Sequence, residues 1–217
     1  MNFSMFVKNE VNLLAIRYPN GKKYVPATEK KASSKKQVKK DLTFSNRGKT
    51  LEDMIDEANA YYLTVKEAVI HKKPVPIQIV NVEYPSRSAA VIREAYFRTP
   101  STTDYNGVYK GHYIDFDAKE TKNKTSFPLK NVHLHQVTHM RAATAQGGIC
   151  FLLIRFSILN RSFVLPFSIL NAAWAEMEKG GRKSIPFDVF EQDAIEIKES
   201  YSPQLDYLKA VTVLLPL

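Results

Sequence analysis

Residues 113–119 read Tyr-Ile-Asp-Phe-Asp-Ala-Lys, an alternation of apolar and polar side chains. Successive side chains of a β-strand point to opposite faces, so strict alternation of apolar and polar residues predicts a half-buried strand. The apolar members of the run would face the core: Ile114, Phe116 and Ala118. The polar members would share the other face: Asp115, Asp117 and Lys119.

A second polar segment, Thr-Thr-Asp at 102–104, lies shortly before this strand. The turn-forming dipeptides Asn-Gly at 106–107 and Lys-Gly at 110–111 separate the two segments, which predicts that they pair as a hairpin. Thr102 and Asp104 would then share a face of their own strand. Acidic groups and one lysine would converge on a small volume.

Carboxylates that converge in this way are suited to Mg²⁺, which prefers oxygen ligands and keeps several of its waters. A bound Mg²⁺ lowers the pKa of a ligated water and polarises a phosphoryl oxygen, and a nearby lysine stabilises the charged transition state. The alternative is a polar sheet face joined by salt bridges. The spacing by itself leaves both interpretations open.

The longer run STTDYNGVYKGHYIDFDAKETKNKTSFPL at 101–129 closely resembles the RecU family of Holliday junction resolvases from Gram-positive bacteria. Shorter segments resemble the same family: AVIHKKP at 68–74, YPSRSAAVI at 84–92, YPNGK at 18–22 and NRG at 46–48. The resemblance extends from about Arg17 to Leu208. It implies an α/β fold of the restriction-endonuclease-like type, with a mixed sheet flanked by helices and a PD-(D/E)xK site. It also implies a homodimer that cleaves four-way DNA junctions with Mg²⁺, or with Mn²⁺ as a substitute, and that contacts the RecA recombinase.

Carried over position by position, the family's metal ligands correspond to Thr102, Asp104, Asp117 and Gln136. The resemblance makes Lys119 the transition-state stabiliser, and Asp104, Asp117 and Lys119 the catalytic residues. The sequence departs from the family at Asp117, where relatives usually have Glu, and we expect activity to survive that change. The family pattern does not use Asp115 as a ligand.

The resemblance also implies a protruding stalk, inserted in the domain at about 69–99. Three basic side chains, Lys72, Lys73 and Arg87, would there meet the phosphates of the junction. The alternation of residues 77–84 itself favours a strand or hairpin arm. Residues 88–97 are compatible with either a second strand or a short helix.

Positive charge is concentrated at one end of the chain, whose 217 residues carry a net charge of +9. Residues 1–47 hold eleven Lys and Arg against three Asp and Glu, a net +8 that leaves only +1 for residues 48–217. Large apolar residues are nearly absent from 26–40, so we expect a largely disordered basic arm ahead of a single nuclease domain at 48–217. Such an arm suits a phosphate backbone. The alternative is a solvated leader without a specific role.

Composition excludes several other classes of protein. No apolar run approaches the roughly 18 residues of a membrane span, and Lys8 and Glu10 interrupt the segment where a secretory signal would need an uncharged core. We therefore expect a cytoplasmic protein, associated with the nucleoid and without membrane contact. The single cysteine, Cys150, allows neither a disulfide framework nor a thiolate metal site within one chain.

Outside the hairpin, hydrophobic spacing predicts a helix capped by Thr50, a helix ending near Gln146, strands at 148–156 and 161–167, a helix over 169–177 and a short closing helix from Tyr207. His135 and His139 have the i, i+4 spacing of a zinc site, but DNA contact or hydrogen bonding is the favoured interpretation. Two functional alternatives stay open beside the resolvase. One is a different repair or restriction endonuclease of the PD-(D/E)xK type, and the other is a DNA-binding recombination protein that no longer cleaves.

Overall fold

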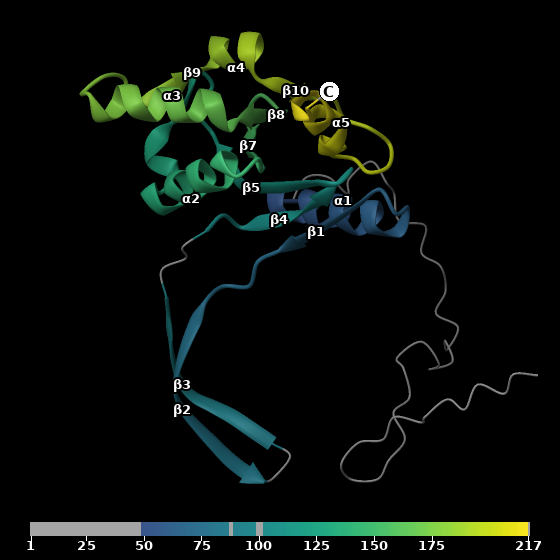
Figure 1. The fold of residues 1–217 in the computed structure, drawn as a ribbon, viewed down its shortest axis with the longest axis vertical. Coiled ribbons are helices and arrows are strands. Elements are labelled where there is room, and N and C mark those ends of the chain that lie inside the picture. Colours follow the sequence, from purple (N-terminus) through teal and green to yellow (C-terminus); the bar gives the residue numbers. More distant parts are fainter. Residues whose placement is uncertain (1–48, 87–88, 99–101, 217) are drawn as a thin grey trace, which may run out of the picture. The chain divides into compact units, whose positions relative to one another are not determined.

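The computed structural model describes residues 49–86, 89–98 and 102–216 (Figure 1). The predicted basic arm at 1–47 and the predicted DNA contact Arg87 lie outside the described residues. The chain divides into two units, one made by residues 80–94 and the other by 49–79 and 95–216. The predicted single domain at 48–217 includes residues of both units, and its bounds stay a prediction.

A six-stranded mixed sheet forms the larger unit, in the order β1-β4-β5-β7-β8-β10. Its strands are β1 Ala68–Lys72, β4 Tyr105–Tyr109, β5 His112–Thr121, β7 Ile149–Phe156, β8 Arg161–Pro166 and β10 Ile195–Ile197. Only the central pair, β5 and β7, is parallel. A parallel pair needs a crossover, and α2 (Leu134–Ala145) lies in it. A hairpin that ends in β5 is confirmed as β4–β5, with Gly111 in its turn at a φ of +80°. Its first strand was predicted wrongly: residues 102–104 precede β4, and Asn106 and Gly107 lie within β4 rather than in a turn.

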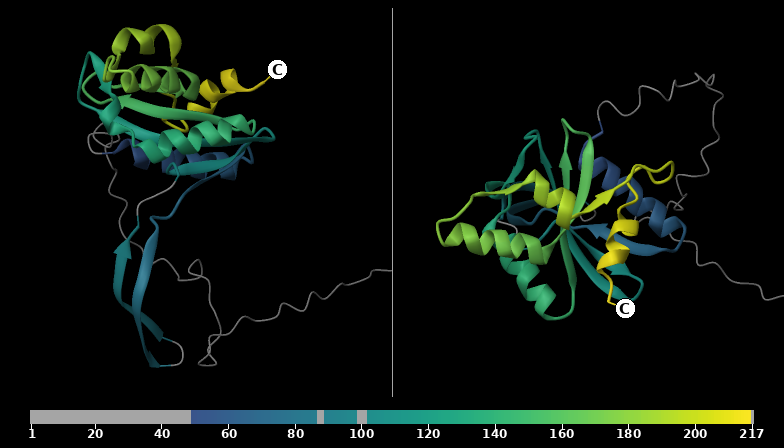
Figure 2. Two further views of the ribbon diagram at one scale, coloured as in Figure 1. Left: turned by 60° about the vertical axis from the view of Figure 1, so that its left-hand side comes forward. Right: turned by 90° about the horizontal axis from the view of Figure 1, so that it is seen from above.

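Helices cover both faces of this sheet (Figure 2). One core lies between the sheet and two helices, α1 (Leu51–Thr64) and α5 (Tyr207–Val211). The other core lies between the sheet and three helices: α2, α3 (Phe167–Glu178) and α4 (Phe187–Asp193). The predicted mixed α/β architecture is confirmed. A small sheet of β6 (Ser126–Pro128) and β9 (Ser184–Pro186) and the 3-10 turns η3 (Leu129–Asn131) and η4 (Thr212–Leu214) complete the unit.

The alternation in β5 sends apolar and acidic side chains to opposite faces as predicted, but both faces are buried in the middle of the strand, so β5 is not half-buried. Ile114 and Phe116 are fully buried on the α1 side, where Phe116 stacks between Tyr105 and Phe151 with ring centroids 4.9 and 4.8 Å apart. Asp117 is also fully buried, and its side chain contacts α2 on the opposite side. The strand that holds the core together therefore also carries the polar face.

The insertion predicted at 69–99 is shorter than expected at its start. Residues 68–72 form β1, which pairs with β4 as an edge strand of the central sheet. A side chain at position 107 would prevent this pairing, because a Cβ on Gly107 would lie 2.1 Å from the carbonyl oxygen of Val69. The pattern of residues 68–72 alone gave no sign of a partner strand 37 positions away.

The inserted segment forms a two-stranded sheet of β2 (Ile77–Ser86) and β3 (Ala89–Phe97), which we call the β2–β3 ribbon. Of residues 88–97, whose pattern is compatible with a strand or a helix, the described part at 89–97 is strand. Almost every described side chain in the ribbon is exposed, and Arg93 pairs with Glu83 at 2.7 Å. Among the described residues, no helix is both long and apolar enough to cross a membrane.

Candidate active site

Asp117 lies at the centre of the predicted site, on β5. Its carboxylate accepts a hydrogen bond from Gln136 Nε2, at the N-terminal turn of α2, and Lys119 Nζ lies 2.7 Å from its Oδ1. Lys119 thus forms an ion pair with this oxygen of the buried carboxylate. Three predicted site residues, from a strand and a helix, are thus in direct contact.

The environment of Asp117 disfavours its ionised form. Burial raises the pKa of this carboxyl to about 6, and Lys119 opposes the rise. Negative charge on Asp104 and Glu52 adds to the rise. Glu52 is an exposed residue of α1, and the packing of α1 against the sheet brings its charge near Asp117.

Thr102 and Asp104 lie in the segment that precedes β4. A cleft of about 160 Å³ is lined by Lys73, Pro74, Val75, Pro76, Thr102, Thr103 and Asp104. Asp104 is close enough to Asp117 to affect its pKa, as the hairpin argument predicts. The Thr102 hydroxyl donates to the carbonyl oxygen of Thr103 at 3.2 Å, so its hydrogen bond is local rather than to Asp117.

Asp115, two residues before Asp117, is the centre of a second polar cluster that the sequence did not predict. Its fully buried carboxylate accepts hydrogen bonds from Thr103 Oγ1, from Tyr113 OH at 2.6 Å and from Lys73 Nζ at 3.0 Å, and it lies 3.0 Å from His139 Nε2. Burial alone would raise the pKa of Asp115, but these four partners together lower it below its usual value.

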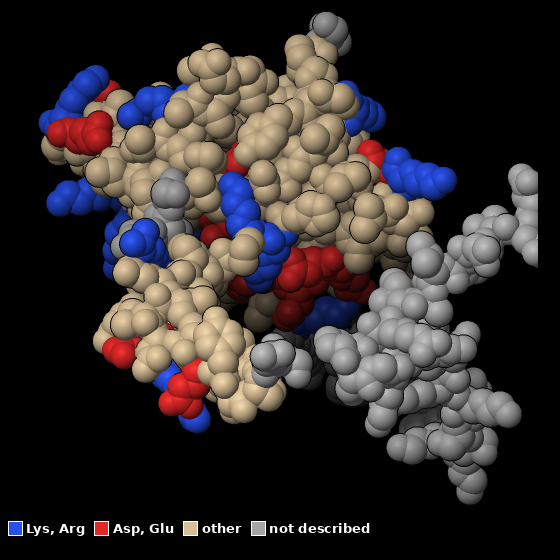
Figure 3. Space-filling model, turned by 60° about the horizontal axis from the view of Figure 1, so that its bottom comes forward, with Lys and Arg blue, Asp and Glu red and all other residues tan. Residues whose placement is uncertain are grey.

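Two of the three predicted DNA contacts, Lys72 and Lys73, are described, and each is held by acidic side chains of this chain. Lys72 Nζ lies 2.7 Å from Glu52 and 3.7 Å from Asp56, both on α1. This helix has a strongly acidic surface, and Figure 3 shows acidic side chains gathered on the face that it draws. Lys73 is bound to Asp115 instead, and Arg87 is outside the described residues. Their role in DNA binding stays a prediction.

The donor set fits Mg²⁺ in part. An ion of this kind needs only one or two carboxylates and keeps its waters, and Asp117 offers a buried carboxylate whose Oδ1 is paired with Lys119. Asp104 is a second carboxylate nearby. Gln136 presents its amide nitrogen to Asp117, while its Oε1 accepts from the backbone N–H of His133 and caps α2. As a side-chain ligand, Gln136 would therefore have to turn its amide.

Zinc has less support. His139 contacts Asp115, whereas His135 stacks on His133 with centroids 5.4 Å apart. Within residues 49–86, 89–98 and 102–216, no group of three or more His, Cys, Asp or Glu is arranged to hold a metal. His135 and His139 therefore contact different partners and do not form a zinc site with each other.

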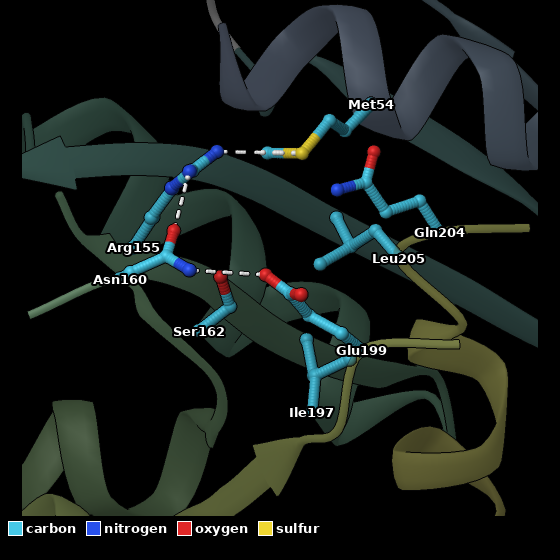
Figure 4. Close-up of a pocket in the computed structure, with 8 residues that line it drawn as sticks. All are labelled: Met54, Arg155, Asn160, Ser162, Ile197, Glu199, Gln204 and Leu205. Carbon is cyan, nitrogen blue, oxygen red and sulfur yellow. Dashed lines mark hydrogen bonds between the residues drawn. The ribbon is translucent and has the colours of Figure 1, made fainter. Parts of the chain in front are cut away.

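A further cavity, of about 20 Å³, lies elsewhere (Figure 4). Arg155 there donates to Asn160 Oδ1 at 2.9 Å and contacts Met54 Sδ at 3.3 Å, and Asn160 in turn donates to Glu199. None of the residues that line this cavity is a predicted site residue. The candidate active site therefore consists of buried Asp117 with the side chains that contact it, together with the cleft beside Asp104.

Comparison of the sequence with known proteins places this chain in a family. The family model "Recombination protein U" (RecU) matches residues 46–213. The protein "Holliday junction resolvase RecU" of Lactiplantibacillus plantarum is 55% identical over 91% of this chain and 95% of its own length. The protein of the same name from Bacillus subtilis is 55% identical over 90% of this chain and 93% of its own.

A solved structure of Archaeoglobus fulgidus Hjc, described as a Holliday junction resolvase, aligns with 53% of this chain and 78% of its own. Its TM-score is 0.32 and its identity 8%, too remote a likeness to support an argument. The family match at 46–213 includes every predicted site residue and all but the last three described residues of the larger unit. This chain belongs to the RecU family.

Proposed function

We propose that this chain is a Holliday junction resolvase, an endonuclease that nicks four-way DNA junctions in the presence of Mg²⁺. The observation that carries the proposal is the contact of buried Asp117 with Lys119 and Gln136 in a chain 55% identical to proteins named as RecU resolvases. Asp117-Ala118-Lys119 has the D-x-K order of a PD-(D/E)xK site, with Asp104 as the preceding acid. The fold that we infer is accordingly the nuclease fold of that class.

Each site residue has a distinct task in this proposal. Asp117 and Asp104 would hold the ion, with Thr102 and Gln136 completing its surroundings. When bound, Mg²⁺ supplies an activated water and a polarised phosphoryl oxygen. The ammonium of Lys119 lies beside Asp117, and its side chain is only 16% exposed. Because water screens this charge little, it would stabilise the negative charge that develops on the phosphate. Gln136 fixes the orientation of the Asp117 carboxylate through its hydrogen bond.

The proposal extends to assembly and partners. A four-way junction needs two opposed nicks, and a homodimer with twofold symmetry would supply two sites at fixed spacing. We propose that the β2–β3 ribbon is the family's stalk, and that Lys72 and Arg87 contact junction phosphates. Contact with RecA and action at the nucleoid, in the cytoplasm, complete the proposal.

The test compares substrates. Purified protein is incubated with a mobile four-way junction and with a linear duplex of the same sequence, in Mg²⁺ and in EDTA. We expect nicking of the junction in Mg²⁺ alone, with at least a tenfold preference over the duplex. Equal cleavage of both DNAs would favour the alternative, a general PD-(D/E)xK endonuclease, and binding without cleavage would favour a recombination protein that does not cut.

A further inference from the structure

The cluster around Asp115 is the feature that the proposed mechanism leaves unused. Its carboxylate is fully buried, yet it holds side chains from three separate segments. Lys73 comes from the segment after β1, Thr103 from the segment before β4, and His139 from α2. So many partners at one carboxylate fix the relative positions of the segments that carry them.

Two of these segments are the connections between the sheet and the β2–β3 ribbon. Lys73 directly follows β1 on the way into the ribbon, and Thr103 lies between the ribbon and β4. They are also tied to each other, because Lys73 Nζ donates to Thr103 Oγ1 at 3.1 Å and Lys73 N donates to the carbonyl oxygen of Asp104 at 2.7 Å. Both connections are therefore bound to the same carboxylate, that of Asp115, and we call this set of hydrogen bonds the clamp.

The predicted site is built on the same elements. Asp117 and Lys119 follow Asp115 on one face of β5, Asp104 follows Thr103, and Gln136 precedes His139 by nearly one turn of α2. The two carboxylates of the site lie on different segments. The β4–β5 ladder joins these segments from Tyr105 onward, where Tyr105 pairs with Phe116, and the side-chain contacts of Asp115 hold the residues before the ladder begins. Loss of the clamp would change the placement of Asp104 relative to Asp117.

We propose that Asp115 is a positioning residue: through Lys73 and Thr103 it fixes the segment that bears Asp104 against the strand that bears Asp117 and Lys119. The inference rests on the proposed function. It gives Lys73 a task within the protein, since its side chain is 21% exposed and its ammonium is paired with a buried carboxylate. A direct DNA contact by Lys73 is the competing role.

Three variants and a rescue separate these roles. Lys73→Met and Thr103→Val each remove one connection from Asp115. Tyr113→Phe is the matched control, because it removes another hydrogen bond to the same carboxylate but from β5 itself. Thr103→Ser restores the hydroxyl. Single-turnover cleavage of a four-way junction by saturating protein in Mg²⁺ is measured for each, with junction affinity in Ca²⁺ over a range of salt concentrations and the thermal midpoint of unfolding.

We expect Lys73→Met and Thr103→Val to cleave at least tenfold more slowly, with junction affinity within twofold of the parent and an unchanged salt slope. Thr103→Ser and Tyr113→Phe should cleave within threefold of the parent. All assays run at least 10 °C below the lowest thermal midpoint, so that a lower rate reflects the folded protein.

Several results would overturn the inference alone. Parent rates in both connection variants would do so, and so would an equal loss in Tyr113→Phe, which would indicate a general structural role. Weaker binding by Lys73→Met with a shallower salt slope would assign Lys73 to the DNA. Failure of the parent chain to cut any junction would instead overturn the proposed function.

Discussion

Asp117 is the residue on which the chemistry depends. Asparagine keeps the shape of the side chain and its hydrogen bond from Gln136, but it removes the charge that holds a divalent ion. We expect Asp117→Asn to bind junctions in Ca²⁺ as well as the parent and to lose cleavage in Mg²⁺ by at least a hundredfold. Asp193→Asn, which changes an exposed carboxylate at the end of α4, is the control and should cleave at the parent rate. Asp117→Glu, the family's usual residue, should stay active.

Replacing Lys119 should affect cleavage differently from replacing Asp117. Its removal should leave the acidic ligands in place but take away a positive charge beside the phosphate, so we expect Lys119→Ala to lower the cleavage rate roughly a hundredfold, or about 3 kcal/mol. The Mg²⁺ concentration for half-maximal cleavage should stay within about threefold of the parent. A large rise in that concentration at an unchanged maximal rate would contradict the assignment.

The raised pKa of Asp117 also makes a prediction about stability. The folded chain holds the Asp117 proton up to a pKa of about 6, against a usual value of 3.8, so ionisation destabilises the fold increasingly from pH 3.8 to 6 and fully above that. In EDTA at pH 8, Asp117→Asn should therefore unfold at a higher temperature, with a gain in free energy of unfolding of up to about 3 kcal/mol. The gain should vanish below pH 4. A variant less stable than the parent at pH 8 would show that the ion pair with Lys119 outweighs the burial cost.

For individual residues, the sequence predicted contacts within one strand better than contacts between distant segments. Alternation placed Asp117 and Lys119 on one face, and resemblance added Gln136, which does contact Asp117. The partners of Asp115 lay beyond prediction, because Lys73 and His139 are 42 and 24 positions away and only the tertiary fold brings them to it.

Among the elements, β1 can pair with β4 only because position 107 of β4 is a glycine. Gly107→Ala would place a methyl group 2.1 Å from the Val69 carbonyl oxygen and 2.7 Å from Ile70 Cα, both backbone atoms that cannot turn aside. We expect a loss of about 2–3 kcal/mol in the free energy of unfolding, from overpacking and displacement of β1. Denaturant unfolding measures it. Gly111→Ala is the control: it meets no atom within 4 Å and should lose about 1 kcal/mol, from its positive φ alone. Equal losses would show that β1 moves aside freely.

The elements that the sequence predicted well are those with local signals. α1 begins where Thr50 and Asp53 predict, and both reciprocal hydrogen bonds of its capping box are present. The expected strands at 148–156 and 161–167 correspond to β7 and β8. The short strands β6, β9 and β10 have three residues each, too few for periodicity to show, and β1 was assigned to the insertion because its partner is distant in sequence.

For the whole molecule, charge is distributed unequally along the chain. If residues 20–40 bind the phosphate backbone, deleting them should weaken junction binding and flatten its dependence on salt, because fewer counterions are released. Binding isotherms at several salt concentrations give the slope. A variant with the same residues 20–40 in scrambled order should keep it. An unchanged slope after deletion would assign the binding of DNA to residues 48–217.

The measurement that tests the central claim most directly is a map of the nicks in a four-way junction. Each of the four strands is end-labelled in turn, and the junction is incubated with the protein and Mg²⁺. The account predicts two nicks at symmetry-related positions in opposite strands, none in EDTA, and none with Asp117→Asn. Nicks scattered over all four strands, or cleavage that survives Asp117→Asn, would contradict it.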